Sequence, residues 1–412
     1  MDSPGVLAPV NTSFLEEAKV VLQEVRTSLA TLVGAVGANP TQPQEIARRF
    51  GLDKTLTWKI ARVICDDDTL AAAVHVPGRA SVRNLVDALE KGGASLESTA
   101  PVLAAMDRFE RLIATHAGDR GTFEVMLGSA SDGLARRRGE TARKMFYQGC
   151  SAIWGVQARV HTSLHFVAPN QASDELLDLG VIAGFVDFRR LRPDVPWAVA
   201  RRSTFTHDGK PQSMGSTVPM DPNLSPADPP ILKQFSSTPV PPLRQTPGQN
   251  NITRFELTEG PIGNTAAATC MLGWIARGES NKYRTGSDVY GEHIVRLSTP
   301  VEVLYHDLYI HRSLGFAMKP DIFIYSDLPG GPTFPYDGLE RGRLPVMEDV
   351  IDLGEGPPNA AAADLPNYRQ MVTFAAERMG WSLNDFHGFR FRLKFPPIPT
   401  LCLYRYGLAE RE

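Results

Sequence analysis

Two pairs of histidines in the C-terminal two-thirds of the chain have a residue type and spacing that could do chemistry. His161 and His165 stand four residues apart, a metal-ligand spacing on a helix, and Arg159 lies close by in the sequence. The alternation of apolar residues around them indicates a strand, on which both rings share the outward face. Because no nearby carboxylate completes a ligand set, we predict surface histidines and no metal site.

The second pair, His306 and His311, lies in the segment LYHDLYIHRSL. On a strand, a spacing of five puts the two rings on opposite faces, which argues against a joint role. Asp307 could form an acid–base pair with either ring, but nothing specifies a nucleophile. We therefore predict no catalytic residue. An enzyme of unrecognised type stays an alternative, favoured if the four histidines share a pocket with Asp or Glu and dropped if they are dispersed on the surface.

Motifs for the common nucleotide-dependent and hydrolytic chemistries are absent from the sequence. It has no G-x-G-x-x-G after a strand, no phosphate-binding G-x-x-x-x-G-K-[ST], no G-x-S-x-G and no H-E-x-x-H. The four cysteines stand far apart with no C-x-x-C pair, which argues against a zinc finger or an iron–sulfur cluster. We expect no cofactor.

One segment carries a recognisable pattern. Ile46–Ile60 reads IARRFGLDKTLTWKI, with a small residue, Ala47, where a first helix would pack against a second. Gly51 follows four residues later, where a turn needs positive φ, and apolar residues flank it. This segment resembles the helix-turn-helix domain of bacterial transcriptional regulators over residues 41–64. The apolar position in the middle of the second helix falls on Thr57, and a one-residue slip would bring Leu56 into the core instead.

The resemblance implies that the second helix lies in the major groove of double-stranded DNA. Lys and Arg would neutralise phosphates, and Thr would read base edges or methyl groups. The DNA-binding residues that it implies are Arg48, Arg49, Lys54, Thr55, Thr57, Lys59 and Arg62. Residues 1–64 carry seven basic and six acidic side chains, which is a small excess of positive charge for a protein that binds double-stranded DNA. A structural or protein-binding role for these helices is therefore the alternative.

Helical periodicity dominates the chain before residue 130. Apolar residues recur every three or four positions from Phe14 to Val36, which predicts an amphipathic helix. Packing inside the domain is the favoured role of this face, and a dimer seam is the alternative. A Gly/Ser stretch at 128–133 and a basic run at 136–144 then predict a solvated hinge.

Strand patterns prevail after the hinge. Residues 154–166 are apolar at every second position, and shorter runs of the same kind recur to the C-terminus. Residues 210–250 are rich in Pro, Ser and Gln and predict a long loop, and residues 357–363 predict a flexible linker. Tyr368–Met379 has helical spacing. The alternation of Phe with Arg and Lys at 389–395 predicts a strand with one face in the core.

Composition places the chain among ordinary globular proteins. It has 412 residues, 42% hydrophobic and 22% charged, with a net charge of −3, so a whole-protein basic field is absent. No signal peptide and no membrane span are visible, which predicts a cytoplasmic protein without membrane contact.

Together these patterns predict a multidomain protein: an all-α helix-turn-helix domain at 1–130, a basic hinge at 131–150 and a β-rich α+β domain at 151–412. The function predicted is a DNA-binding transcriptional regulator whose C-terminal domain senses a ligand or forms a homo-oligomer. The main alternative is a structural or assembly protein with a helical adaptor domain.

Overall fold

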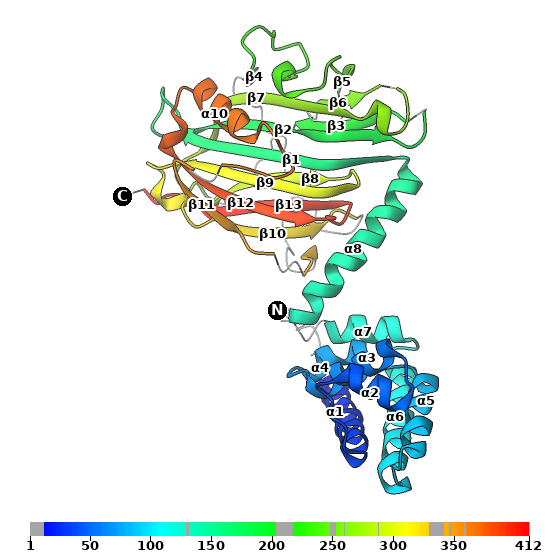
Figure 1. Cartoon of the computed structure of the whole chain (residues 1–412). Coiled ribbons are helices and arrows are strands. Elements are labelled where there is room, and N and C mark those ends of the chain that lie inside the picture. The colour runs from blue at the N-terminus through cyan, green and yellow to red at the C-terminus, as the bar shows by residue number, and fades with distance from the viewer. Residues whose placement is uncertain are drawn as a thin grey trace, which may run out of the picture. The chain divides into compact units, whose positions relative to one another are not determined.

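Helices fill the N-terminal part of the chain and strands fill most of the rest, as the sequence predicts (Figure 1). The computed structural model describes residues 12–128, 132–193, 195–202, 217–247, 253–258, 260–286, 288–328, 342–345, 348–357 and 360–411. The chain divides into two compact units, Met1–Gly139 and Glu140–Glu412, called here the helical unit and the β-rich unit. Among the described residues, no helix has both the length and the apolar character needed to cross a bilayer.

The helical unit is built around one apolar core. The helices are α1 (Thr12–Ala35), α2 (Pro43–Phe50), α3 (Lys54–Cys65), α4 (Thr69–Ala72), η1 (Ala73–His75), α5 (Arg79–Lys91), α6 (Leu96–His116) and α7 (Arg120–Gly128). The apolar face of α1 from Phe14 to Val36 is buried in this core against α3, α4 and α6. It therefore packs within the unit, as favoured from the sequence, and is not free to serve as a dimer seam.

The segment predicted as a basic hinge is a helix instead. α8 (Asp132–Trp154) is continuous across it and leads into the first strand. Within the β-rich unit, Tyr147, Cys150 and Ser151 recur at helical spacing and are buried. Arg143 donates to a carboxylate oxygen of Glu348 at 2.5 Å. The basic run hid this helical periodicity. The boundary between the two units, at Gly139 and Glu140, lies inside the segment predicted as a hinge.

The β-rich unit is organised by a seven-stranded sheet in the order β11-β12-β9-β1-β2-β7-β4. β1 and β9 are parallel, and the other neighbours are antiparallel. The strands are β1 (Val156–Pro169), β2 (Leu176–Arg190), β4 (Thr217–Pro219), β7 (Ala268–Asn281), β9 (Val301–His311), β11 (Ile351–Glu355) and β12 (Phe386–Lys394). β4 and β5 (Leu243–Pro247) both fall in the predicted loop at 210–250, where strand pairing orders part of this Pro-rich segment.

Both faces of the seven-stranded sheet are covered. α10 (Tyr368–Met379) packs on one face through Val372, Ala376 and their neighbours (Figure 1). The opposite face packs against two three-stranded sheets, β10-β13-β8 and β3-β6-β5. Their strands are β3 (Trp197–Arg202), β5 (Leu243–Pro247), β6 (Thr253–Leu257), β8 (Tyr290–Leu297), β10 (Asp321–Ser326) and β13 (Thr400–Gly407). The central strands therefore have no solvent-facing side, a fact that decides where the histidines lie.

Candidate functional site

The two helices and the glycine turn predicted at residues 46–60 are present as α2 and α3. Gly51 has φ +65°, and its N–H and that of Leu52 donate to the carbonyl oxygen of Ala47. Asp53 caps α3, because its carboxylate accepts the N–H of Leu56 at 3.0 Å. The left-handed glycine ends α2 and the Asp cap begins α3 within three residues, which fixes the turn between the helices.

The inner side of α3 is fixed to the rest of the helical unit. Leu56, Ile60 and Val63 are buried in the core. At the C-terminal end of α3, Arg26 of α1 donates its Nε to the carbonyl oxygen of Ile64 at 2.9 Å and its Nη1 to Thr69 at 3.2 Å. The helix is therefore held at both ends, and its outer side is exposed.

The outer side of α3 carries four of the predicted DNA-binding residues: Lys54, Thr55, Lys59 and Arg62 are all exposed. Arg48 and Arg49, also predicted, are exposed on α2. These six side chains come from two consecutive helices and include five cations.

Thr57 is the exception. Its exposed fraction is 1%, and its hydroxyl donates to the carbonyl oxygen of Lys54 at 3.1 Å. Leu56 is buried as well, at 9%. Both residues face inward because they stand one helical turn before Ile60, on the side of α3 that packs on the core. The expectation that Thr57 is exposed to DNA is wrong, and its buried hydroxyl is satisfied within the helix.

Trp58 is a surface residue that the sequence reasoning missed. Its exposed fraction is 44%, and the guanidinium of Arg62 lies 5.2 Å from its ring centroid. The ring also meets His75 of η1 edge-on, with centroids 5.2 Å apart. Trp58 therefore places a large apolar ring among the cations on the outer side of α3. The helical spacing of Trp58 from Lys54 and Arg62, four residues in each direction, could have revealed it.

The local charge of the two helices is more favourable for DNA than that of the wider segment. Residues 43–65 carry five basic side chains and two acidic ones, Glu45 and Asp53. The Asp53 carboxylate is engaged in the helix cap. A modest positive charge is therefore concentrated on α2 and α3.

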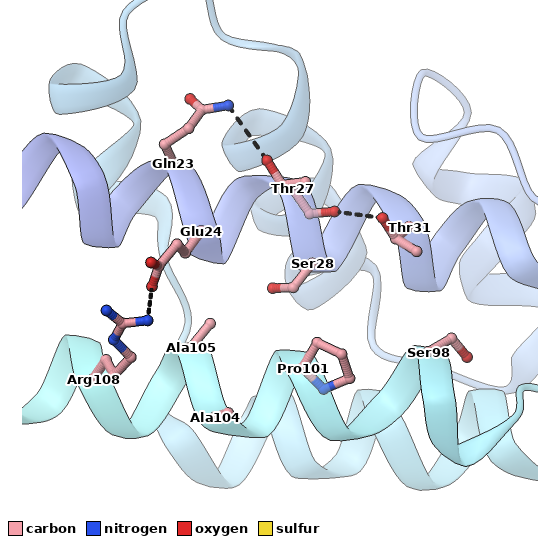
Figure 2. Close-up of a pocket in the computed structure, with 10 residues that line it drawn as sticks. All are labelled: Gln23, Glu24, Thr27, Ser28, Thr31, Ser98, Pro101, Ala104, Ala105 and Arg108. Carbon is pink, nitrogen blue, oxygen red and sulfur yellow. Dashed lines mark hydrogen bonds and ion pairs between the residues drawn. The ribbon is translucent and has the colours of Figure 1, made fainter.

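The helical unit also contains a groove of about 490 Å³ between α1 and α6 (Figure 2). Its α6 wall consists of small residues such as Ala104 and Ala105, and an ion pair of 2.9 Å between Glu24 and Arg108 spans one end. The Ser28 hydroxyl in its α1 wall donates to the backbone of its own helix. The groove results from small side chains where larger ones would fill the space between the helices.

In the β-rich unit, the sheets enclose a cluster of four histidines. His161, His165, His293 and His306 are each 7% exposed or less. The ring centroid of His165 lies 5.1 Å from that of His306 and 5.5 Å from that of His293. His161 stacks on Phe185 at 4.4 Å. The prediction that His161 and His165 lie on the surface is wrong, because a second sheet layer covers their face of β1.

Hydrogen bonds within this histidine cluster come mainly from neutral partners. His165 Nε2 lies 3.0 Å from the Ser163 hydroxyl, and His293 Nε2 lies 3.1 Å from the Tyr406 hydroxyl. Burial lowers the pKa of His161 and of His293 to about 3, and each is further lowered by the charge of His306. All of these rings are therefore neutral at physiological pH.

The surroundings of the histidine cluster differ from what the enzyme alternative requires. No three His, Cys, Asp or Glu side chains of the described ranges are placed to hold a metal ion. Asp307 follows His306 directly but lies with the residues that face α10. His311 is partly exposed at the end of β9, where its Nδ1 bonds the Ser313 hydroxyl at 2.8 Å. The four predicted histidines thus do not share one pocket with a carboxylate.

Asp307 belongs to a buried ion pair on the α10 side of the large sheet. Its carboxylate accepts two hydrogen bonds from Arg390, at 2.8 and 3.1 Å, and one from the hydroxyl of Tyr368. Burial acts to lower the pKa of Arg390, but the charge of Asp307 outweighs it and raises that pKa above its usual value. The Tyr309 hydroxyl completes the group, 2.6 Å from that of Tyr368.

Further hydrogen bonds from arginines connect this buried ion pair to neighbouring segments nearer the surface. Arg390 donates to the carbonyl oxygen of Ala361 at 2.6 Å, and Arg392 donates to the Asp364 carboxylate at 3.1 Å. Arg159 bonds the backbone oxygen of Asp364 and the carboxylate of Asp187. The segment predicted as a flexible linker is therefore fixed to the sheet at Ala361, and the network has a structural role.

Comparison with known proteins gives no further guide, since no protein-family model, curated protein or solved structure matches this chain.

Proposed function

We propose that the helical unit binds double-stranded DNA through α3 and that the chain acts as a transcriptional regulator. The observation that carries the proposal is the outer side of α3, where Lys54, Thr55, Lys59 and Arg62 are exposed together. The helix is held at both ends and preceded by a glycine turn, the arrangement that places a recognition helix in the major groove.

The contact expected from each side chain on this surface follows from its chemistry. Arg48 and Arg49 on α2 have the charge for phosphate contacts, and Lys59 and Arg62 can meet either phosphates or guanine edges. Five cations that each neutralise a phosphate would give a slope of roughly −4 to −5 for log K against log salt. Such a slope is modest, so specific binding must depend on base contacts from α3.

The test is the affinity of the full chain for a DNA fragment selected from random sequences, measured by fluorescence polarisation over a range of salt. We expect Lys59→Ala and Arg62→Ala each to weaken binding roughly tenfold, about 1.4 kcal/mol. The control is Arg111→Ala, which removes an exposed arginine from α6. The proposal fails if the full chain shows no salt-sensitive DNA binding, or if the control variant weakens binding as much as the other two.

A helical adaptor for a protein partner is the second candidate function, and Trp58 favours it. Tryptophan and arginine are the side chains most often found at the energetic centre of protein interfaces. Trp58, 44% exposed and stacked by Arg62, has this composition. If the surface serves a protein, Trp58→Ala should abolish partner binding in pull-downs while Lys59→Ala leaves it nearly unchanged. DNA binding predicts the larger loss for Lys59→Ala.

A further inference from the structure

The exposed side of α8 within the β-rich unit is apolar. Met145, Phe146 and Ile153 are 68%, 46% and 70% exposed. With three small exposed residues they form the apolar stripe of α8, defined as Ala142, Met145, Phe146, Gly149, Ala152 and Ile153. At 3.6 residues per turn these six positions fall within about 120° of one another, centred on Gly149.

The opposite side of α8 is already occupied. Tyr147 meets the ring of Phe395 at 5.3 Å, and Cys150 lies in the core between the sheets. Arg143 donates to Glu348 and to the backbone of Lys394. The helix therefore has one apolar side buried against the β-rich unit and a second apolar side in water.

The apolar stripe also lacks charge. From Met145 to Trp154 the sequence MFYQGCSAIW contains no charged residue. A partner with a strong charge, such as a nucleic acid, would find nothing to pair with on it. A surface that meets its own copy across a two-fold axis benefits from the absence of charge, because like charges would otherwise face each other at the axis.

We propose that the apolar stripe of α8 is a homodimer interface in which two α8 helices cross antiparallel at Gly149. Around this axis, residues an equal number of positions before and after Gly149 face each other. Met145 then meets the Ile153 position of the second copy, and Phe146 meets Ala152. The stripe is thus self-complementary: each Phe146 packs over a small residue, and the missing side chain at Gly149 lets the backbones approach closely.

The size of this contact sets the expected strength of the dimer. Two stripes of six residues bury on the order of 800 Å² in total, less than the roughly 1,200–2,000 Å² of standard stable interfaces. We therefore expect a weak, concentration-dependent dimer. The inference goes beyond DNA binding and does not depend on it.

The first test is the mass of the full chain by analytical ultracentrifugation from roughly 1 μM to several hundred micromolar. We expect a monomer–dimer equilibrium rising from 45.1 kDa toward twice that mass. Gly149→Leu separates the interface from folding. A Cβ at Gly149 would meet nothing within 4 Å in the monomer, and Leu has the higher helix propensity, so the variant should raise the melting temperature. It should also weaken the dimer at least tenfold, whereas Gln148→Leu, on the neighbouring exposed position, should not.

The second test is crosslinking at the axis. In a Cys65→Ser background, which removes the exposed native cysteine, Gly149→Cys should form a disulfide-linked dimer under mild oxidation. Gln148→Cys is the matched control and should crosslink far less. A monomer at every concentration overturns the proposal, as does equal crosslinking at the two positions. A monomer in which Gly149→Cys reacts slowly with a thiol reagent would show that another part of the same chain covers the stripe.

Discussion

Acid should destabilise the β-rich unit through its buried histidine cluster. Burial lowers the pKa of His161 and His293 to about 3 and that of His306 to about 4, and holds that of His165 well below its usual range. In the unfolded chain the same rings titrate near 6.5. Below pH 6.5 the unfolded state therefore binds more protons than the folded state, and stability falls as the pH falls.

The size of this loss in stability depends little on the pKa values of the rings in the folded state, provided that these are about 4 or less. Between pH 7.5 and pH 5.0, a histidine with an unfolded pKa of 6.5 and a folded pKa of 4 or less loses about 2 kcal/mol of stabilisation. Three independent rings, those of His161, His293 and His306, would lose up to about 6 kcal/mol, a large part of the roughly 5–15 kcal/mol that keeps a typical domain folded. His165 adds to the loss in the same direction. Most carboxylates contribute little above pH 5, because they titrate near pH 4 in unfolded chains. Burial raises the pKa of Asp307, so this group acts in the opposite direction to the histidines.

Urea unfolding followed by tryptophan fluorescence measures this loss. In a Trp58→Phe background the four remaining tryptophans all lie in the β-rich unit, so the signal reports on that unit alone. We expect the free energy of unfolding to fall steeply from pH 7.5 to pH 5.0. His161→Leu should reduce this fall by about 2 kcal/mol, because the variant has one fewer ring to protonate on unfolding.

The matched control is His311→Leu, since His311 is only partly buried and stands outside the cluster. Burial lowers the pKa of His311 as well, with the charge of Asp385 acting against it, so this variant should reduce the fall by less than His161→Leu does. A free energy of unfolding that is constant between pH 7.5 and pH 5.0 would refute the reasoning. An equal change for His161→Leu and His311→Leu would refute the assignment to the cluster.

Two further changes test the buried ion pair and the turn. Asp307→Asn should cost about 3–5 kcal/mol in urea unfolding, because it leaves the cation of Arg390 buried without its counterion, and the double change with Arg390→Met should recover part of the loss. A loss below 1 kcal/mol would contradict the view that the pair is desolvated. Gly51→Ala should lower the stability of the helical unit by about 1–2 kcal/mol in thermal unfolding, because the residue has φ +65° and no atom lies close enough for a steric effect. An unchanged melting temperature would show that the turn relaxes.

Local periodicity was enough to predict the main elements. The alternation around His161 predicted β1, and the helical spacing from Tyr368 to Met379 predicted α10. Each of these segments follows one period over its whole length, so the pattern is not ambiguous.

The errors share a physical cause, which is that local sequence does not report what covers an element. His161 and His165 alternate with apolar residues, as the exposed face of a strand would, yet a second sheet covers that face. The run at 136–144 has the charge of a hinge, but Tyr147 and Cys150 anchor a helix through contacts with residues more than 200 positions away. On α3, the motif puts an inward, apolar position at Thr57, but the polar side chain there led to the expectation that it is exposed. A polar residue at an inward position cannot be told from an outward one until the packing is known.

The parallel pairing of β1 with β9 has a consequence for how the chain is made. Ala158 is in register with Val301, so the partner of this edge of β1 is synthesised more than 140 residues later. At about 5–20 residues per second, the ribosome needs roughly 7–30 s to supply it. During that time the β1–β2 hairpin exposes an apolar strand with unpaired N–H and C=O groups, which is a template for association with other chains. The helical unit can fold first as the chain emerges, whereas the β-rich unit can complete its sheet only after most of its length is translated.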